Sequence, residues 1–209
     1  MVNNISARKK YFIKIFEKAE KHYSSSTKRL AADGWDKDWQ MLIATMMSAQ
    51  TRDETTIPVA ENLFKNYSTL EKLSKAKYDD VLKIIRRVNF SPRKAKYIIE
   101  TAKILVKEYK SKVPADIDIL VTFPGVGRKT ANLFISEVHN MDGICVDTHV
   151  HRISNVFRFV KTNTPEQTER ELRKLVPQKY WSRINRVFVL WGQDVRGKDK
   201  KKFLERLND

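Results

Sequence analysis

The chain has 209 residues, and its 41 Lys and Arg against 25 Asp and Glu give a formal net charge of +16. An apolar fraction of 41% suits a folded protein and argues against disorder, while so large a surplus of cations predicts a polyanionic partner such as nucleic acid. No apolar stretch approaches the ~20 residues that span a bilayer. The amphipathic N-terminus is unlike a secretory signal, so we expect a soluble intracellular protein, cytoplasmic and nucleoid-associated, or nuclear in a eukaryote.

In chain order, apolar residues at helical spacing predict helices around 12–19, 42–47, 81–85, 98–105, 133–138, 150–157, 172–176 and 187–191. Turn-forming residues separate these sets at 24–27, 90–94, 113–116, 141–143 and 162–166. "TPEQ" at 164–167 has the composition of a capped helix start, with Thr164 as N-cap. No stretch alternates as a strand does. The predicted fold is therefore all-α, with about ten short helices.

The C-terminal segment "RGKDKKKFLERLND" combines a run of lysines with Phe203, Leu204 and Leu207 at helical spacing. We expect a short docked helix with a basic outer face.

The stretch "FPGVGRKTA", residues 123–131, predicts a glycine-rich turn that opens a helix. Pro124 suits a turn, and Gly125 and Gly127 allow positive φ and leave backbone N–H groups accessible. Such a helix N-terminus binds anions, and Arg128 adds a positive charge beside it. With short helices expected on both sides, at 115–123 and 128–139, the segment is a candidate helix–hairpin–helix for DNA phosphate.

Lys129 follows Arg128 at the positive end of the same helix, where acidic residues are usual. One interpretation is a further phosphate contact. The other is an activated amine, because like charge and partial burial would both disfavour the ammonium form and enrich the nucleophile. The residues alone leave both open.

Asp147 stands where another helix is expected to begin, within "GICVDTHVHRISN" at 143–155. Asp is a favoured N-cap, and a capping Asp keeps one oxygen available for other contacts. A structural cap and a functional carboxylate are therefore compatible.

Taken together, "FPGVGRKTAN" and "VDTHVHRISN", whose aspartate lies 18 residues after the lysine, resemble the helix–hairpin–helix DNA glycosylases, and endonuclease III most closely. "LIATMMSAQTRDETT" upstream resembles the same family, and the similarity runs from about residue 40 to 192. The resemblance implies two helical lobes, with the active site in the cleft between them. We assign residues 27–140, with the helix–hairpin–helix, to a central domain, and 1–26 plus 141–209 to a second domain.

The resemblance also implies roles for single residues. Lys129 matches the nucleophile that attacks the sugar, and Asp147 the carboxylate that stabilises positive charge on it. Gln50 matches the residue that fills the space of a flipped-out nucleotide, and Phe90 an apolar wedge. Hairpin residues and two residues near Asp147 are implied to contact DNA: Gly125, Gly127, Arg128, Thr130, His149 and Arg152. Backbone carbonyls of Val121, Phe123 and Val126 match those that hold a structural monovalent cation or Mg²⁺.

Two departures from the family stand out. Its members usually end in a four-cysteine loop that binds an iron–sulfur cluster, whereas Arg196 stands here at the first such position and Cys145 is the only cysteine. We therefore expect no cluster and no cofactor. The second departure is Val121, which replaces a glutamate near the lysine.

His149 and His151, two residues apart, cannot share a helix face as metal ligands, so metal catalysis is not expected.

The resemblance implies a base-excision DNA glycosylase with β-eliminating lyase activity, acting as a monomer on oxidised pyrimidines such as thymine glycol in double-stranded DNA. One alternative keeps the fold but changes the substrate to 8-oxoguanine or to deaminated or mismatched bases. The other is a non-catalytic DNA-binding module, in which Lys129 only contacts phosphate. A carboxylate such as Asp147 disfavours that module, because it would repel DNA.

Overall fold

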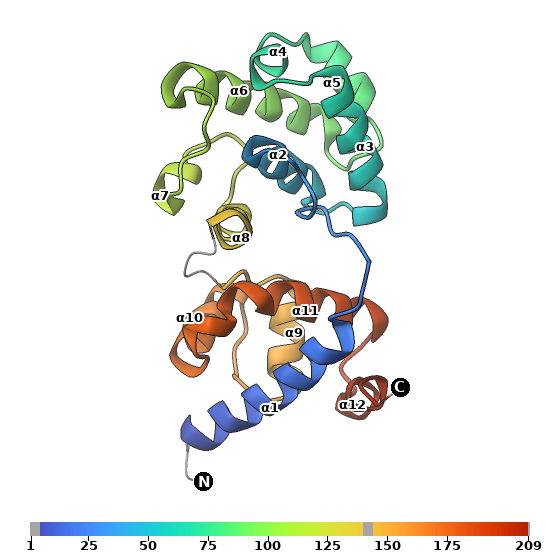
Figure 1. Ribbon diagram of the computed structural model, residues 1–209, viewed down its shortest axis with the longest axis vertical. Helices are drawn as coiled ribbons and strands as arrows, with labels where there is room; N and C mark the ends of the chain where they lie inside the picture. Colours follow the sequence, from blue (N-terminus) through green and yellow to red (C-terminus); the bar gives the residue numbers. More distant parts are fainter. Residues whose placement is uncertain (1–4, 140–143, 209) are drawn as a thin grey trace. The chain divides into compact units, whose positions relative to one another are not determined.

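A computed structural model describes residues 5–139 and 144–208 (Figure 1). Within these ranges all regular secondary structure is helical, which confirms the all-α prediction. The predicted break at 141–143 lies outside the described residues. None of the helices in the part of the chain that is described is long and apolar enough to cross a membrane.

The chain divides into two compact units, one of residues 29–139 and the other of residues 1–28 together with 140–209. We call the first the central unit and the second the terminal unit. Each has its own buried core, and the candidate site residues are distributed over both.

Seven helices build the central unit: α2 Asp38–Ser48, α3 Asp53–Asn66, α4 Leu70–Ser74, α5 Tyr78–Ile85, α6 Ser91–Tyr109, α7 Ile117–Leu120 and α8 Arg128–His139. The long helix α6 packs against α2, α4 and α5, while α2 also packs against α3 and α8 (Figure 1). Their apolar faces enclose one core that includes Leu42, Ile98 and Phe134, each fully buried. The hairpin between α7 and α8 is thus fixed to this core from both sides.

The periodic sets in the sequence do not include α3 and α4. Helix α3 has Pro58 in its interior, which removes one backbone donor, yet it buries Val59, Leu63 and Phe64 against the core. Helix α4 is a single short turn whose N-cap, Thr69, accepts a hydrogen bond from the backbone of Lys72. Val59, Leu63 and Phe64 stand at helical spacing, so the signal for α3 was present in the sequence. Helix α4 is too short to show a helical period, and tertiary packing stabilises it.

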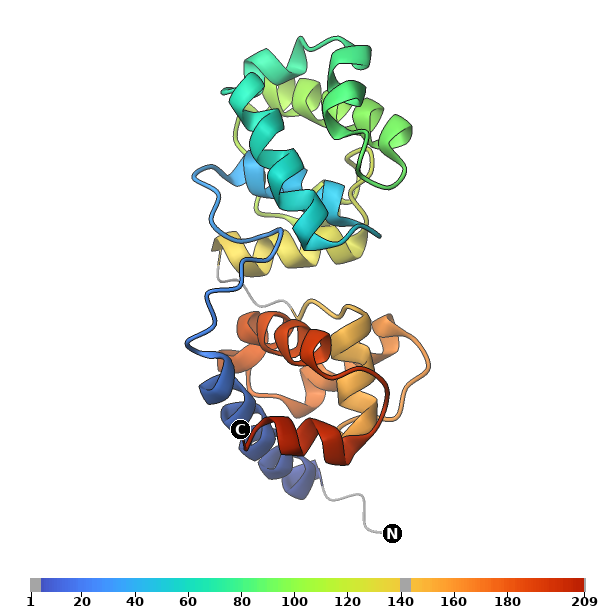
Figure 2. The same ribbon diagram turned by 90° about the vertical axis from the view of Figure 1, so that its right-hand side faces the viewer.

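The terminal unit contains α1 Ile5–Tyr23, α9 Thr148–Val156, α10 Pro165–Leu175, a 3₁₀ turn η1 Gln178–Tyr180, α11 Trp181–Asp194 and α12 Lys200–Arg206 (Figure 2). Helix α11 packs against α1 and α9. The core is strongly aromatic, and its fully buried rings pack mostly at tilted or edge-on angles. They belong to Phe12, Phe16, Phe157, Phe159, Phe188, Trp191 and Phe203.

The C-terminal segment forms the docked helix that its apolar spacing predicts. Phe203 of α12 is fully buried, with its ring edge-on to that of Trp191, and the Trp191 indole donates to the Phe203 carbonyl at 3.1 Å. Arg206 pairs with Asp194 at 3.3 Å, and Lys18 of α1 donates to Asn208. Helix α12 is thereby attached to both α11 and α1.

Candidate functional site

The hairpin, residues 121–127, is a rigid turn between α7 and α8. Phe123 and Val126 are buried, the Val126 N–H donates to the Phe123 carbonyl at 3.0 Å, and Thr101 of α6 donates to the Pro124 carbonyl at 3.2 Å. Side chains and backbone therefore fix the turn before any ligand binds.

The two hairpin glycines have different reasons to be glycine. Gly125 has φ +77°, and a Cβ there would stand 2.6 Å from the Tyr97 ring. Gly127 is not among the residues at positive φ, so it does not use the conformation that a glycine allows. A Cβ on Gly127 would meet nothing within 4 Å. Its side of the turn is open to a ligand.

Helix α8 begins immediately after this open turn. The Gly127 carbonyl accepts the first helical hydrogen bond, from the Ala131 N–H at 3.0 Å. Arg128 and Lys129 are exposed and Thr130 is half-buried, and the first turn of α8 has no acidic residue. Two cations and the positive end of the helix dipole therefore coincide, which favours an anion here.

Asp147 is the N-cap of α9 in the terminal unit. Its side chain is half-buried, and its Oδ1 accepts from the Val150 backbone N–H at 2.8 Å. The cap uses Oδ1, and a carboxylate offers several acceptor positions on two oxygens. Lys129 belongs to the central unit and Asp147 to the terminal unit.

Arg152, one turn further along α9, is tied to the end of α11. Its guanidinium donates to the carbonyls of Gly192 at 2.6 Å, Val195 at 3.1 Å and Gly197 at 3.1 Å. Burial lowers the pKa of Arg152, while the negative charge of Asp147 opposes that shift. Arg152 thus satisfies backbone carbonyls that α11 leaves without helical partners.

His149 shares this corner of the terminal unit. Its Nδ1 lies 3.3 Å from the Arg152 guanidinium, and the ring is half-buried. Gly192 makes room for both side chains, because a Cβ there would stand 2.3 Å from His149 Nδ1 and 2.9 Å from Arg152. The glycine therefore allows both side chains to lie against α11 in these positions.

Gln50 and Phe90 lie far apart in sequence, and the central unit brings their turns together. Both are exposed and both have left-handed backbones, with φ 57° and 59°. The Asn89 side-chain amide donates to the Gln50 carbonyl, and the Asn89 N–H donates to Thr51 Oγ1 at 3.1 Å. We call residues 49–51 the α2 turn and residues 88–90 the α6 turn.

Lys94, which the sequence analysis did not single out, joins the same two turns from beneath. It is 8% exposed, and its Nζ donates to the carbonyls of Met47 at 2.7 Å and Ala49 at 2.6 Å. The available signal was "SPRKA", a second helix start with cations and no acidic residue in its first turn.

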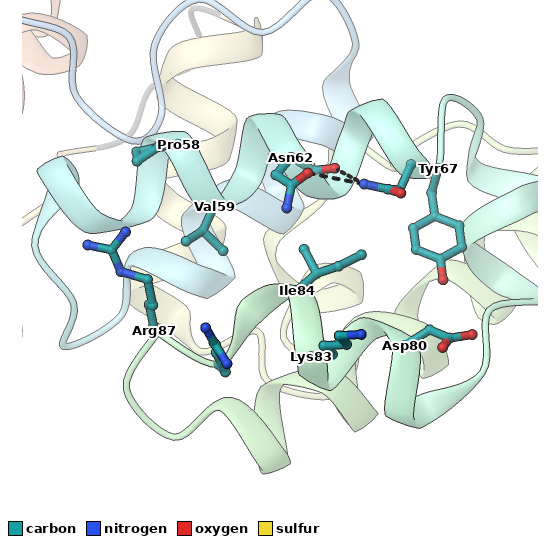
Figure 3. A pocket seen from close by; sticks show the side chains of 10 residues that line it. Pro58, Val59, Asn62, Tyr67, Asp80, Lys83, Ile84 and Arg87 are labelled. Atoms are coloured by element: carbon teal, nitrogen blue, oxygen red, sulfur yellow. Dashed lines mark hydrogen bonds between the residues drawn. The ribbon is translucent and has the colours of Figure 1, made fainter.

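A surface groove also opens between α3 and α5 in the central unit (Figure 3). Val59 and Ile84 form its apolar part, and Lys83, Arg86 and Arg87 bring cations to one side. None of the residues predicted for the site lines this groove.

The residues present do not fit an iron–sulfur cluster. Four thiolates are needed within one chain, and Cys145 is the only cysteine and is buried in the terminal unit. Across residues 5–139 and 144–208, no group of three or more His, Cys, Asp or Glu is arranged to hold a metal ion. Three hairpin carbonyls are predicted to hold a cation, and one of them, that of Phe123, already accepts a hydrogen bond from the Val126 N–H.

Comparison with known proteins defines the family. Residues 43–178 match the model of the HhH-GPD superfamily base excision DNA repair proteins. Endonuclease III from Thermotoga maritima is 42% identical over 157 residues, which cover 75% of this chain and 74% of the relative. A trapped endonuclease III–DNA covalent intermediate has a TM-score of 0.83 and 27% identity, with 91% of this chain and 89% of that chain covered. A non-covalent endonuclease III–DNA complex has a TM-score of 0.81 and 28% identity, covering 88% and 86%. The chain therefore belongs to the HhH-GPD superfamily of base excision DNA repair proteins.

Proposed function

We propose that this chain, a base-excision DNA N-glycosylase with apurinic/apyrimidinic lyase activity, acts on oxidised pyrimidines such as thymine glycol in double-stranded DNA. The observation that carries the proposal is the exposed Lys129 in the first turn of α8, directly after the open face of Gly127. A relative captured as a covalent complex with DNA supports a nucleophilic amine at this place.

Lys129 is the proposed nucleophile. Its Nζ forms a bond to the sugar C1′ while the glycosidic bond breaks and that bond's electron pair leaves with the base, which takes up a proton. Nζ then loses a proton, and the C1′–O4′ bond breaks as O4′ takes up a proton, which opens the sugar ring. The resulting Schiff base makes the C2′ proton acidic. Loss of that proton expels the 3′ phosphate, and water then releases the lysine.

Asp147 is the proposed electrostatic partner. Positive charge develops on the sugar as the base departs, and a fixed carboxylate stabilises that charge more in the transition state than in the ground state. The cap bond from Val150 holds Asp147 in one rotamer. The same carboxylate can accept a proton during the elimination.

The hairpin is proposed to bind the phosphates of the damaged strand. Gly125 shapes the turn, Gly127 leaves the α8 N-terminus open, and Arg128 with Thr130 adds a cation and a hydroxyl. His149 and Arg152 are proposed to support the DNA-facing surface around Asp147. We also propose that carbonyls of Val121, Phe123 and Val126 hold a structural cation.

Gln50 and Phe90 are proposed to act on the helix stack. An exposed aromatic can enter between base pairs, and a polar side chain can fill the space that a flipped nucleotide leaves. Phe90 is 52% exposed although it is a large apolar side chain. A DNA base stack would cover it.

Borohydride trapping tests the chemistry. We expect the protein to become covalently linked to abasic and thymine-glycol DNA, and Lys129→Gln to abolish the link while duplex binding is largely kept. The matched control is the neighbouring Arg128→Gln, which should weaken binding and still be trapped at saturating protein. An Lys129→Gln protein that is trapped as well as the parent would remove the assignment.

The substrate class is tested separately, by single-turnover excision on duplexes that each carry one lesion. We expect thymine glycol to be excised faster than 8-oxoguanine, uracil or a mismatched thymine. Faster excision of one of those bases would mean that the enzyme uses the same chemistry on that base and not on oxidised pyrimidines. Absence of both excision and trapping would leave only a DNA-binding module.

A further inference from the structure

Lys94 is a cation where the fold would ordinarily place an apolar side chain. It is 8% exposed, and burial lowers its pKa to about 8, so keeping an ammonium there is costly. Lysines are almost never buried this far without a specific partner. The proposed reaction does not use Lys94.

The partners of Lys94 are the backbone carbonyls at the end of α2. The last carbonyls of a helix have no helical donor, and they form the negative end of the helix dipole. Lys94 Nζ donates to two of these groups, Met47 O at 2.7 Å and Ala49 O at 2.6 Å, and lies 3.5 Å from Thr51 Oγ1. The chain therefore leaves α2 in a direction that a side chain of α6 determines.

Both turns joined by Lys94 contain a strained residue. Gln50, with φ 57°, follows Ala49, whose carbonyl Lys94 holds. Phe90, with φ 59°, is the N-cap of α6, and the Lys94 N–H donates to its carbonyl at 3.0 Å. Left-handed backbones at residues other than glycine persist only where surrounding contacts impose them. Lys110, Ser111 and Arg158 also have positive φ, and what sets Gln50 and Phe90 apart is that Lys94 contacts both turns.

Phe90 is also unusual among the caps of this protein. Eight of the described α-helix N-caps have extended backbones, as N-caps normally do, namely Lys37, Arg52, Thr69, Lys77, Asp116, Asp147, Thr164 and Asp199. Phe90 is left-handed and has no side-chain cap bond. Its carbonyl accepts the first helical hydrogen bond of α6, and its aromatic ring is exposed.

We propose that Lys94 is a positioning residue that joins the α2 turn and the α6 turn into one preformed wedge, so that Gln50 and Phe90 enter the DNA together. The Asn89 bonds to Gln50 and Thr51 are the outer part of the same connection. Because the wedge is set before DNA arrives, its ordering does not subtract from binding. This inference rests on the proposed roles of Gln50 and Phe90.

The test compares two substrates that differ only in their need for a wedge. A duplex with a damaged base must be unstacked and its vacancy filled, whereas a single-stranded abasic oligonucleotide has neither requirement. We expect Lys94→Met, which keeps the side-chain length, to lower the ratio of duplex excision rate to single-strand trapping rate by roughly tenfold to a hundredfold, the scale for a misplaced group. A purely structural loss would lower both rates together and leave the ratio unchanged, which would overturn the proposal.

The matched control is Lys96→Met, an exposed lysine of the same helix that pairs with Glu100 at 4.0 Å, and we expect its ratio to match the parent. Asn89→Ala keeps the proposal testable if Lys94→Met does not fold, because Asn89 is exposed. It should reduce the ratio in the same direction by a smaller factor. An unchanged ratio in Asn89→Ala and in a folded Lys94→Met would refute the preformed wedge.

Gln50→Ala and Phe90→Ala distinguish the positioning role of Lys94 from the proposed wedge roles of Gln50 and Phe90, on which it depends. If both leave duplex excision unchanged, the proposed wedge roles fail. If both reduce it and Lys94→Met does not, only the positioning role of Lys94 fails. Fluorescence of 2-aminopurine beside the lesion reports the unstacking directly, and it should rise less in Lys94→Met than in the parent.

Discussion

Asp147 accepts the backbone N–H of Val150 at 2.8 Å, and so begins α9 with the same carboxylate that is proposed to face the sugar. The two roles can be separated, because Asn caps a helix nearly as well as Asp but carries no charge. The hydrogen bond from Val150 stabilises the start of α9, whereas the negative charge is proposed to stabilise the transition state.

Asp147→Asn should therefore keep its unfolding temperature and lose excision. We expect the single-turnover rate to fall by roughly 10² or more, the scale for removing one electrostatic stabiliser, while duplex affinity stays equal or rises. Asp199→Asn is the matched control, because Asp199 caps α12 in the same way through the Lys201 N–H at 2.8 Å. Reduced affinity with unchanged excision in Asp147→Asn would leave that residue as a cap only.

The hairpin glycines give a paired test. Gly125→Ala should lower the free energy of unfolding by about 1–3 kcal/mol, because the new Cβ meets Tyr97 at 2.6 Å and the backbone has φ +77°. Gly127→Ala has open space and should fold normally, yet it should weaken duplex binding by obstructing the phosphate. Urea unfolding and fluorescence anisotropy measure the two effects. Full affinity in Gly127→Ala would place the phosphate elsewhere.

The C-terminal lysines should contribute to binding through phosphate contacts. Lys200 lies 5.1 Å from the Tyr11 ring centre and has a packing role, so the informative change is Lys198, Lys201 and Lys202 to Gln. Each lysine that contacts a phosphate should reduce the log–log salt slope by about one unit. Replacement of the exposed Lys103, Lys107 and Lys112 by Gln is the control for net charge. Equal slopes in both variants would mean that α12 does not touch DNA.

Helix α12 should be stabilised by its aromatic contacts and not by iron. Phe203 is fully buried against Trp191, so Phe203→Ala should cost about 3–5 kcal/mol of unfolding free energy. We expect the purified protein to be colourless and its unfolding to be unaffected by a chelator. Visible absorbance that a chelator removes would contradict this view, as would a Phe203→Ala protein of parental stability.

Lys94 predicts a distinct pH dependence. Burial lowers its pKa from 10.5 to about 8, so between these values the unfolded chain binds more protons than the folded one. Stability rises with pH wherever that holds. The penalty for burying the ammonium is therefore fully present below pH 8 and is relieved as the pH rises toward 10.5.

The measurement is the difference in unfolding free energy between the parent and Lys94→Met, taken at pH about 7 and about 10 so that other titrating groups cancel. The parent should gain relative to the variant at the higher pH. If the difference in unfolding free energy is the same at both pH values, the pKa of Lys94 does not differ between the folded and unfolded states.

Several helix starts are visible in the sequence because their determinants are local. Thr164 accepts the Gln167 N–H at 3.3 Å and begins α10 where "TPEQ" predicts, and Asp147 begins α9 in the same manner. A cap, a proline at the first helical position and a helical period each act within a few residues. They are therefore readable in one short stretch of sequence.

The tertiary structure decided what depends on distant partners. Lys94 has its partners only because Met47 and Ala49, more than 40 positions away, end their helix beside it, and Arg152 is bound by carbonyls of similar separation. Gly127 looked like Gly125 in sequence, yet only Gly125 meets Tyr97 and takes a positive φ. The sequence by itself determined most of the helices, the caps at Asp147 and Thr164 and the charged hairpin, since these follow from neighbouring residues. Burial of a lysine, the space beside a glycine and the meeting of two turns follow from packing, which arises only when remote segments of the chain come together.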